Sequence, residues 1–166
     1  MTEADIDIVV LGDHDRTTFE SGSILLDNYF KTQVRQDIKR RVATCFVAVD
    51  QENMVLGYYT MAAASILLDS FPETIVKKLP RYPIVPAVLL GRLAIVKNRQ
   101  GQGLGSILLV NALTRIYKSD IGAFAMIVDA KDEKAASFYA HFGFQTLDGP
   151  LRLFLPLNSV RDIIAQ

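Results

Sequence analysis

Residues 87–117, which read AVLLGRLAIVKNRQGQGLGSILLVNALTRIY, decide the fold. The nearly continuous apolar run from Ala87 to Val96 is typical of a central strand that is buried on both faces. A glycine loop follows from Arg99 to Gly105, and a helix is predicted from Ser106 because apolar residues then recur at helical spacing, at Leu109, Leu113, Ile116 and Tyr117. The stretch therefore predicts a strand, a glycine loop and a helix in succession.

The rest of the chain alternates between strand and helix patterns, without a linker or a repeat. Strands are expected at residues 6–11, 42–49, 54–65, 122–129, 144–147 and 151–155, of which the second and third form a hairpin. Helices are expected from about residue 23, between Pro72 and Pro80, at residues 132–141 and after a cap at Asn158. This order predicts one mixed α/β domain, residues 1–166, around a twisted sheet.

The composition excludes several classes of protein. Half of the 166 residues are hydrophobic, which excludes an intrinsically disordered chain. The single cysteine, Cys45, is expected to be a buried and inert thiol, and it favours a reducing, cytoplasmic location because it has no disulfide partner. With only two histidines besides, no metal site is predicted. No signal peptide and no membrane-spanning run are found in the sequence.

The charges balance in number but not in position. The 18 Lys and Arg residues match 18 Asp and Glu residues, yet no acid occurs between Glu73 and Asp120, where there are eight bases. A further basic stripe, Lys31, Arg35 and Lys39, recurs every fourth residue along the first predicted helix. Such segregation favours a polyanionic ligand or an acidic partner, although solvated surface charges would produce the same pattern.

The glycine loop is of the kind that holds phosphates, because the N-terminus of a helix presents unpaired backbone N–H groups to an anion. A P-loop requires a lysine before the Ser or Thr, whereas Ser106 follows Gly105 directly. A dinucleotide fingerprint requires G-x-G-x-x-G, whereas Gly101, Gly103 and Gly105 form G-x-G-x-G. Spacing therefore excludes both of these nucleotide sites.

The remaining pattern is Q-x-x-G-x-G, formed by Gln100, Gly103 and Gly105, and it resembles the loop of the GNAT acyltransferases. The resemblance implies the GNAT fold, a central twisted, mixed and mostly antiparallel sheet of about six to seven strands flanked by helices. It also implies acetyl-CoA as cosubstrate. The residues that would contact the pantetheine arm are Leu93, Ala94, Ile95 and Val96, and those that would hold the pyrophosphate are Gln100, Gly101, Gln102, Gly103, Leu104, Gly105 and Ser106.

Three longer stretches narrow the resemblance. LGRLAIVKNRQGQGLGSILL (90–109), MIVDAKDEKAASFYAHFGF (126–144) and FESGSILLDNYF (19–30) resemble the toxin GNATs of bacterial type II toxin–antitoxin modules. This implies transfer of acetyl to the α-amino group of aminoacyl-tRNA, which blocks translation. It further implies a ribbon-helix-helix antitoxin and a homodimer.

Tyr139 matches the tyrosine that the family uses as general acid, and Phe138 before it is a candidate cofactor contact. A phenol with a pKa of about 10 stays protonated at neutral pH and can protonate a departing thiolate. The backbone N–H groups of residues 93–95 are candidates for polarising the thioester carbonyl. Without the glycine loop, a core tyrosine with a satisfied hydroxyl would be the ordinary interpretation of Tyr139.

No general base is evident, which favours an α-amine acceptor, because its pKa of roughly 8 leaves part of it neutral near pH 7. Candidate tRNA-binding residues are Lys31, Arg35, Lys39, Lys77, Lys78, Arg81 and Arg92. Two other hypotheses remain at this point. One is a GNAT that acetylates a small amine or a protein N-terminus, and the other is a non-catalytic module that senses CoA or binds a protein.

Overall fold

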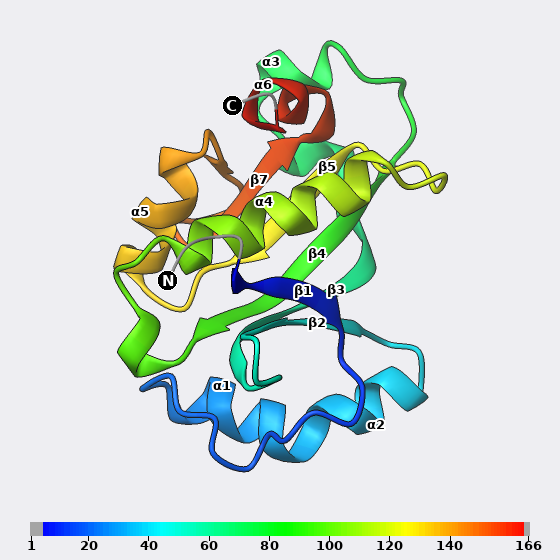
Figure 1. Ribbon diagram of the computed structural model, residues 1–166. Helices are drawn as coiled ribbons and strands as arrows, with labels where there is room; N and C mark the ends of the chain where they lie inside the picture. Colours follow the sequence, from blue (N-terminus) through cyan, green and yellow to red (C-terminus); the bar gives the residue numbers. More distant parts are fainter. Residues whose placement is uncertain (1–4, 165–166) are drawn as a thin grey trace. The chain divides into compact units, whose positions relative to one another are not determined.

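The computed structural model describes residues 5–164 and shows a mixed α/β protein with a seven-stranded sheet (Figure 1). The strand order is β1-β2-β3-β4-β5-β7-β6. The described residues form two compact units, 5–62 with 91–112, and 63–90 with 113–164. Strands β3 (Val55–Leu67) and β4 (Ile84–Ile95) and helix α4 (Leu104–Tyr117) run through both units.

The strands of the first unit form an antiparallel sheet. β1 (Asp7–Val10) pairs with β2 (Thr44–Val49), and β2 pairs with β3. In the turn between β2 and β3, the Asp50 carboxylate accepts hydrogen bonds from the N–H groups of Glu52 and Met54, at 2.9 and 3.0 Å. This confirms the predicted hairpin.

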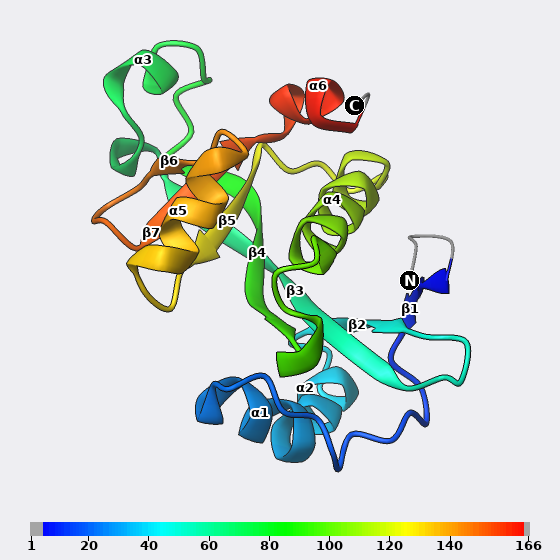
Figure 2. The same ribbon diagram turned by 60° about the vertical axis from the view of Figure 1, so that its left-hand side comes forward.

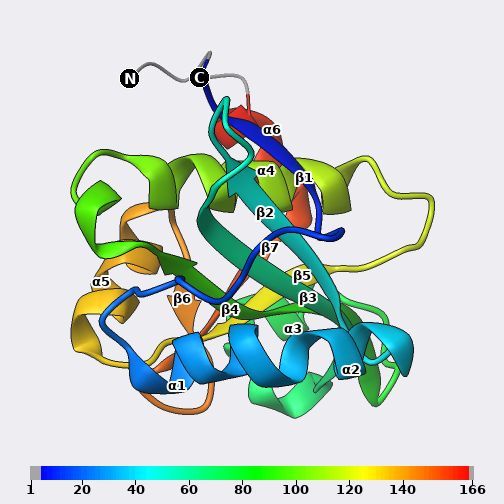
Figure 3. The ribbon, with the colours of Figure 1, turned by 60° about the horizontal axis from the view of Figure 1, so that its bottom comes forward.

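The predicted first helix consists of α1 (Ile24–Asn28), a π-helical turn (Tyr29–Gln33) and α2 (Val34–Lys39), which follow one another along one line in Figure 3. The Ser23 side chain caps it by accepting from the N–H of Leu26. Helical spacing in the sequence predicts an apolar face made of Ile24, Leu25, Tyr29, Phe30 and Val34. This prediction is wrong in the first turn, because Ile24 and Leu25 are 77% and 84% exposed. Leu26 and Asp27 take the inward positions instead, since they lie four and three residues before the buried Phe30.

The core of the first unit has an aromatic centre. Phe30 stacks on Tyr58 with ring centroids 4.3 Å apart, and Phe19 packs against both rings. Cys45 lies in the same cluster, is 1% exposed, and its pKa is raised to about 12 by burial. The expected inert thiol is therefore confirmed.

In the second unit, β4 and β5 (Ala125–Asp129) form a parallel strand pair. β7 (Arg152–Pro156) is antiparallel to β5, and β6 (Gln145–Thr146) is antiparallel to β7. A mixed and mostly antiparallel sheet is thus confirmed. β4 begins three residues before the expected position and β5 three residues after it.

Helices complete the second unit, in which α5 (Glu133–His141) packs on β7 (Figure 2). The Asp132 carboxylate caps α5 by accepting from the N–H of Ala135 at 2.8 Å, and Gly143, with φ of 97°, follows its end. The short helix α3 (Glu73–Val76) lies between Pro72 and Pro80 as expected. The cap predicted at Asn158 is wrong, because this residue lies inside a 3₁₀ turn (Leu157–Ser159) that precedes α6 (Val160–Ile164).

A close contact between β3 and β4 limits what can stand at position 57. A Cβ atom on Gly57 would lie 2.8 Å from Ile95 Cδ1, 2.9 Å from the Ala94 carbonyl oxygen and 3.0 Å from Leu108 Cδ1. We expect Gly57→Ala to lower the free energy of unfolding by about 1–3 kcal/mol, because backbone atoms cannot move aside cheaply. Urea denaturation measures the change.

Gly122→Ala is the matched control, because a Cβ there would meet nothing within 4 Å. A Gly57→Ala protein as stable as the Gly122→Ala protein would show that β3 and β4 are not this close.

Candidate active site

The predicted glycine loop lies between β4 and α4 in the first unit. β4 ends at Ile95, a 3₁₀ turn spans Lys97–Arg99, and α4 begins at Leu104, two residues before the predicted start. The earlier start follows from the hydrogen bond of the Ile107 N–H to the Gly103 carbonyl, 3.1 Å long, which closes the first helical turn.

This loop forms a cradle of backbone groups that suits an anion. Gly101 and Gly103 have φ of 78° and 86°, in the left-handed region that favours glycine, and no protein atom lies within 4 Å of a Cβ built on either. The N–H groups of residues 104–106 have no partner within α4, because they belong to its first turn. Together with the positive end of the helix dipole, these groups could hold an anion.

Gln100 holds the loop in place through its side chain. Its amide nitrogen Nε2 donates to the Ser21 carbonyl at 2.7 Å and to the Ile95 carbonyl at 2.8 Å. It thereby joins the end of β4 to the segment that precedes α1. The amide nitrogen of Gln100 is engaged by the protein itself, so its place in the motif has a structural reason that the sequence did not reveal.

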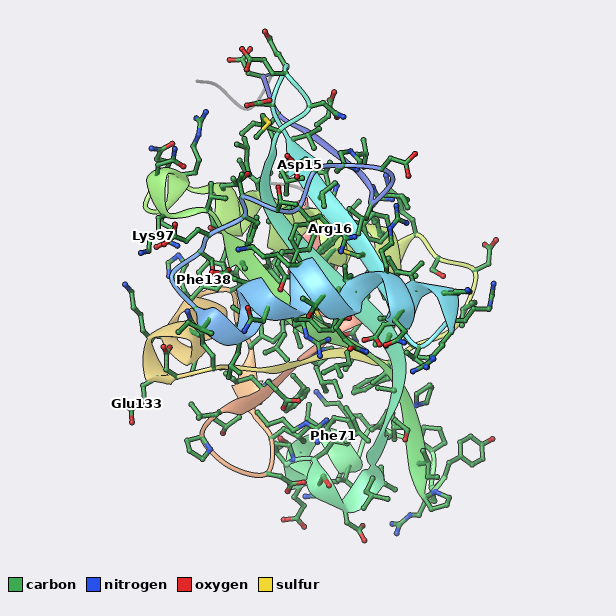
Figure 4. All side chains as sticks on the ribbon, turned by 90° about the horizontal axis from the view of Figure 1, so that it is seen from below. Asp15, Arg16, Phe71, Lys97, Glu133 and Phe138 are labelled. Atoms are coloured by element: carbon green, nitrogen blue, oxygen red, sulfur yellow. The ribbon has the colours of Figure 1, made fainter. Side chains whose placement is uncertain are left out.

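The segment before α1 is fixed by further bonds. The buried Asp27 carboxylate accepts from the Ser21 N–H at 3.0 and 3.1 Å and from the Ser21 hydroxyl at 2.6 Å. The Lys97 N–H donates to the Glu20 carbonyl at 2.9 Å, and the Lys97 Nζ pairs with the Glu20 carboxylate at 3.2 Å. Lys97 projects from the turn after β4 (Figure 4).

A pocket of about 470 Å³ opens beside this junction in the first unit. Apolar and charged side chains from three segments line it: Asp15, Thr18, Phe19, Glu20, Asp50, Met54, Val55, Leu56, Val96, Lys97, Asn98 and Arg99. Acids and bases are mixed along its wall, so its charge selects neither an anion nor a cation.

The four strand residues expected to contact the pantetheine arm differ in their surroundings. The side chain of Ala94 belongs to the aromatic cluster, whereas Leu93 and Ile95 pack with Leu104 and Leu108 of α4. The N–H of Val96 donates to the Leu56 carbonyl at 2.9 Å. Any contact of Ala94 and Ile95 with a ligand therefore has to come from their backbone, since their side chains are buried, whereas the side chain of Leu93 is only partly buried.

Tyr139 and Phe138 lie in the second unit, in α5. The Tyr139 ring is 7% exposed and contacts the rings of Phe138 and Phe144, with centroids 5.2 and 5.5 Å away. Among residues 5–164, its hydroxyl has no hydrogen-bond partner. Burial raises the pKa of Tyr139, so the phenol is fully protonated at neutral pH.

The candidate basic residues fall into three groups. Lys31, Arg35 and Lys39 are exposed along one helix, where Arg35 donates to the Gly12 carbonyl and pairs with Asp13 at 3.4 Å. In the second unit, exposed bases lie just after α3, namely Lys77, Lys78 and Arg81. Arg92 is half-buried and stacks on the ring of Tyr29, a contact that the sequence did not indicate.

Neither a metal-binding cluster nor a membrane-spanning helix occurs among the described residues. No three His, Cys, Asp or Glu side chains of residues 5–164 gather where they could hold a metal ion. Within the same range, every helix is too short or too polar to cross a bilayer.

Comparison with known proteins places these features in a wider group. Residues 41–146 match the Acetyltransferase (GNAT) domain. Over 155 residues the chain is 34% identical to a tRNA-acetylating toxin of Mycobacterium tuberculosis, with 92% of each chain covered.

Two solved structures are similar along almost the whole chain. AtaT complexed with acetyl-methionyl-tRNAfMet has a TM-score of 0.89 at 30% identity, covering 96% of this chain and 99% of that one. A mutant AtaT toxin bound to the C-terminus of the antitoxin AtaR and acetyl-CoA has a TM-score of 0.83 at 27% identity, covering 98% of this chain and 99% of that one.

The role of Gln100 in holding the loop can be tested by Gln100→Met. This change keeps the length of the side chain but leaves the carbonyls of Ser21 and Ile95 without their donor. We expect the free energy of unfolding to fall by about 1–3 kcal/mol. Hydrogen exchange should also become faster around residues 20–23.

Gln102→Met is the matched control, because Gln102 donates only to the Asn98 carbonyl, at 3.3 Å on the surface. Its effect on unfolding should stay within about 0.5 kcal/mol. Equal effects of the two substitutions would contradict a special role for Gln100.

Proposed function

Because this chain belongs to the GNAT acetyltransferase family, in the group that contains the tRNA-acetylating toxins, we propose that it transfers acetyl from acetyl-CoA to the α-amino group of aminoacyl-tRNA. The observation that carries the proposal is the backbone cradle between β4 and α4, whose Gly101 and Gly103 are open to an anion. The modified tRNA carries an amide in place of its reactive amine, and translation stops.

The cradle residues would hold the diphosphate of acetyl-CoA, namely Gln100, Gly101, Gln102, Gly103, Leu104, Gly105 and Ser106. Residues 93–96, together with Phe138, are proposed to contact the rest of the cosubstrate. Gln100 contributes by shaping the loop, and the backbone N–H groups contribute the charge complementarity. The acetyl-CoA found on a similar AtaT toxin supports this assignment.

Acetyl-CoA supplies a thioester whose carbonyl is attacked by an amine and whose sulfur departs as a thiolate. We assign to Tyr139 the protonation of that thiolate, while the proton that the amine loses after attack passes to water, from which the phenol is restored. Its pKa is raised by burial, so the proton is in place at every physiological pH. Its hydroxyl is committed to no other group among the described residues, which leaves the O–H available for transfer.

An aminoacyl acceptor suits a site without an evident base. The α-amine of an aminoacyl ester needs little help to lose its proton, whereas a lysine side chain with a pKa of about 10.4 needs much more. The similar AtaT was captured with acetyl-methionyl-tRNAfMet, which is the product of such a transfer. The exposed bases of the chain, Lys31, Arg35, Lys39, Lys77, Lys78 and Arg81, together with Arg92, are proposed to contact the RNA.

A chain with this activity needs an inhibitor, since unrestrained acetylation of charged tRNA stops growth. A similar AtaT toxin binds the C-terminus of the antitoxin AtaR. We propose a cognate antitoxin for this chain as well, of the ribbon-helix-helix type that the family resemblance implies. A homodimer in the cytoplasm, where charged tRNA is found, completes the proposal.

The acceptor and the role of Tyr139 can be tested together with labelled acetyl-CoA. The purified protein is incubated with charged tRNA, uncharged tRNA, polyamines and peptides, and label is expected on charged tRNA alone. Tyr139→Phe should lower kcat by about 10²- to 10⁴-fold with little change in KM for acetyl-CoA, because only the proton donor is lost. Label on polyamines or peptides would contradict the tRNA acceptor, and an unchanged kcat would contradict the general acid.

The cradle can be tested by Gly103→Val. The Val side chain is strained at a φ of 86° and occupies the open space beside the backbone. We expect the Kd for acetyl-CoA, measured by calorimetry, to rise more than about tenfold.

Gly149→Val is the matched control, because Gly149 also has a positive φ, 121°, and no protein atom within 4 Å of a built Cβ, but it lies outside the loop. Equal losses of affinity in the two variants would show that strain, not the cradle, is responsible.

A further inference from the structure

Arg92 lies immediately before the strand residues assigned to acetyl-CoA, and among the described residues its side chain is held by an aromatic ring and not by an ion pair. The guanidinium carbon is 3.4 Å from the centroid of the Tyr29 ring, which is a stacked cation–π contact. The side chain is half-buried, yet it makes no hydrogen bond or ion pair with any other residue in the range 5–164. A partly desolvated guanidinium whose N–H donors have no protein acceptor is suited to an anionic ligand.

The ring beneath Arg92 is itself fixed. The Tyr29 hydroxyl donates to Asp37 Oδ2 at 2.7 Å, and Gln33 Nε2 donates to Asp37 Oδ1 at 3.1 Å. These bonds hold the pKa of Asp37 below its usual value, so its carboxylate remains an acceptor at neutral pH. Arg92 also lowers the pKa of Asp37 through its charge, although the two side chains form no ion pair among the described residues, so the Asp37 carboxylate acts on Arg92 mainly by orienting the Tyr29 ring.

The π-helical turn brings these groups together. Tyr29 begins the turn, Gln33 ends it, and Asp37 lies one helical turn further on. Arg16 Nη1 donates to the Phe30 carbonyl at 2.7 Å and to the Lys31 carbonyl at 3.3 Å, which satisfies carbonyls at the irregular turn. Figure 4 shows Arg16 beside this helix. The turn is therefore a defined feature with its own supporting bonds.

We propose that Arg92, oriented by Tyr29 and Asp37, receives a phosphodiester group at the 3′ end of the charged tRNA. This inference rests on the proposed function, since the amine at that end of the tRNA must reach the thioester held beside Leu93–Val96. Stacking covers one face of the guanidinium, so it offers its edge, whose parallel N–H groups match two oxygens of a phosphate. Arg92 is then a binding residue, and Tyr29 and Asp37 are positioning residues that act through it.

Direct binding of tRNA provides the test, separately from acetyl transfer. The Kd for charged tRNA is measured without acetyl-CoA, by fluorescence anisotropy at several salt concentrations. Arg92→Gln should raise this Kd about tenfold and reduce the slope of log Kd against log salt by about one, as expected for one lost phosphate contact. Arg92→Lys should recover less than half of the loss, because a lysine lacks the planar fork.

The positioning role is tested by a double-mutant cycle. Tyr29→Leu should raise the Kd for tRNA several-fold in the wild-type background and add nothing to Arg92→Gln, because Tyr29 acts only through Arg92. If Tyr29→Leu fails to fold, Tyr29→Phe keeps the ring, removes only the bond to Asp37, and should show a smaller effect with the same non-additivity. Lys118→Gln removes an exposed charge outside the proposed tRNA surface and serves as the control for charge alone.

Several results would overturn the proposal. The first is a Kd for tRNA and a salt slope that do not change in Arg92→Gln. The second is a double mutant in which the effects of Tyr29→Leu and Arg92→Gln simply add. The third is an Arg92→Gln protein that loses affinity for acetyl-CoA and not for tRNA. Failure of the proposed function is recognised separately. A wild-type protein that binds charged tRNA through Arg92 but leaves it unacetylated would refute the enzyme assignment while supporting this contact.

Discussion

The hydrogen bonds of the Gln100 amide to the Ser21 and Ile95 carbonyls are the constraint on which the candidate cosubstrate site depends. They hold the end of β4, the glycine turn and the approach to α1 in one arrangement. Only then can the left-handed Gly101 and Gly103 direct the turn into the N-terminus of α4. A cradle made of backbone N–H groups has no side chain of its own to position it, so its geometry depends on such neighbouring bonds.

The end of β4 and the segment before α1 are also held in place by packing and by further hydrogen bonds. Gly57 leaves no room for a Cβ between β3 and the end of β4, and the side chains of Ala94 and Ile95 are buried on opposite faces of the sheet. The buried Asp27 carboxylate fixes Ser21, the residue that receives the Gln100 bond. Packing and hydrogen bonding thus both fix the end of β4 and the loop that follows it. A binding site made of backbone groups requires such rigid support.

The chemistry needs few groups beyond this framework. An α-amine acceptor is partly neutral already, so the protein has to supply mainly a proton for the departing sulfur. Tyr139 is the proposed source of that proton, because a phenol is protonated at neutral pH and the Tyr139 hydroxyl is not engaged by the described residues. Arg92 contributes differently, as a charge whose plane is set by the Tyr29 ring. The proposed mechanism thus assigns anion recognition and proton transfer to different residues.

Sequence alone determined the order of strands and helices, the buried thiol of Cys45, the glycine loop and the family, because periodicity, glycine spacing and local motifs are carried by neighbouring residues. Several features were decided only by the tertiary structure: the partners of the Gln100 amide, the π-helical turn at Tyr29–Gln33, the exposure of Ile24 and Leu25, and the stacking of Arg92. Two of these depend on residues far apart in the chain, Gln100 with Ser21 and Arg92 with Tyr29. A local pattern contains no information on which distant carbonyl or ring a side chain will meet, and packing of the whole chain selects it.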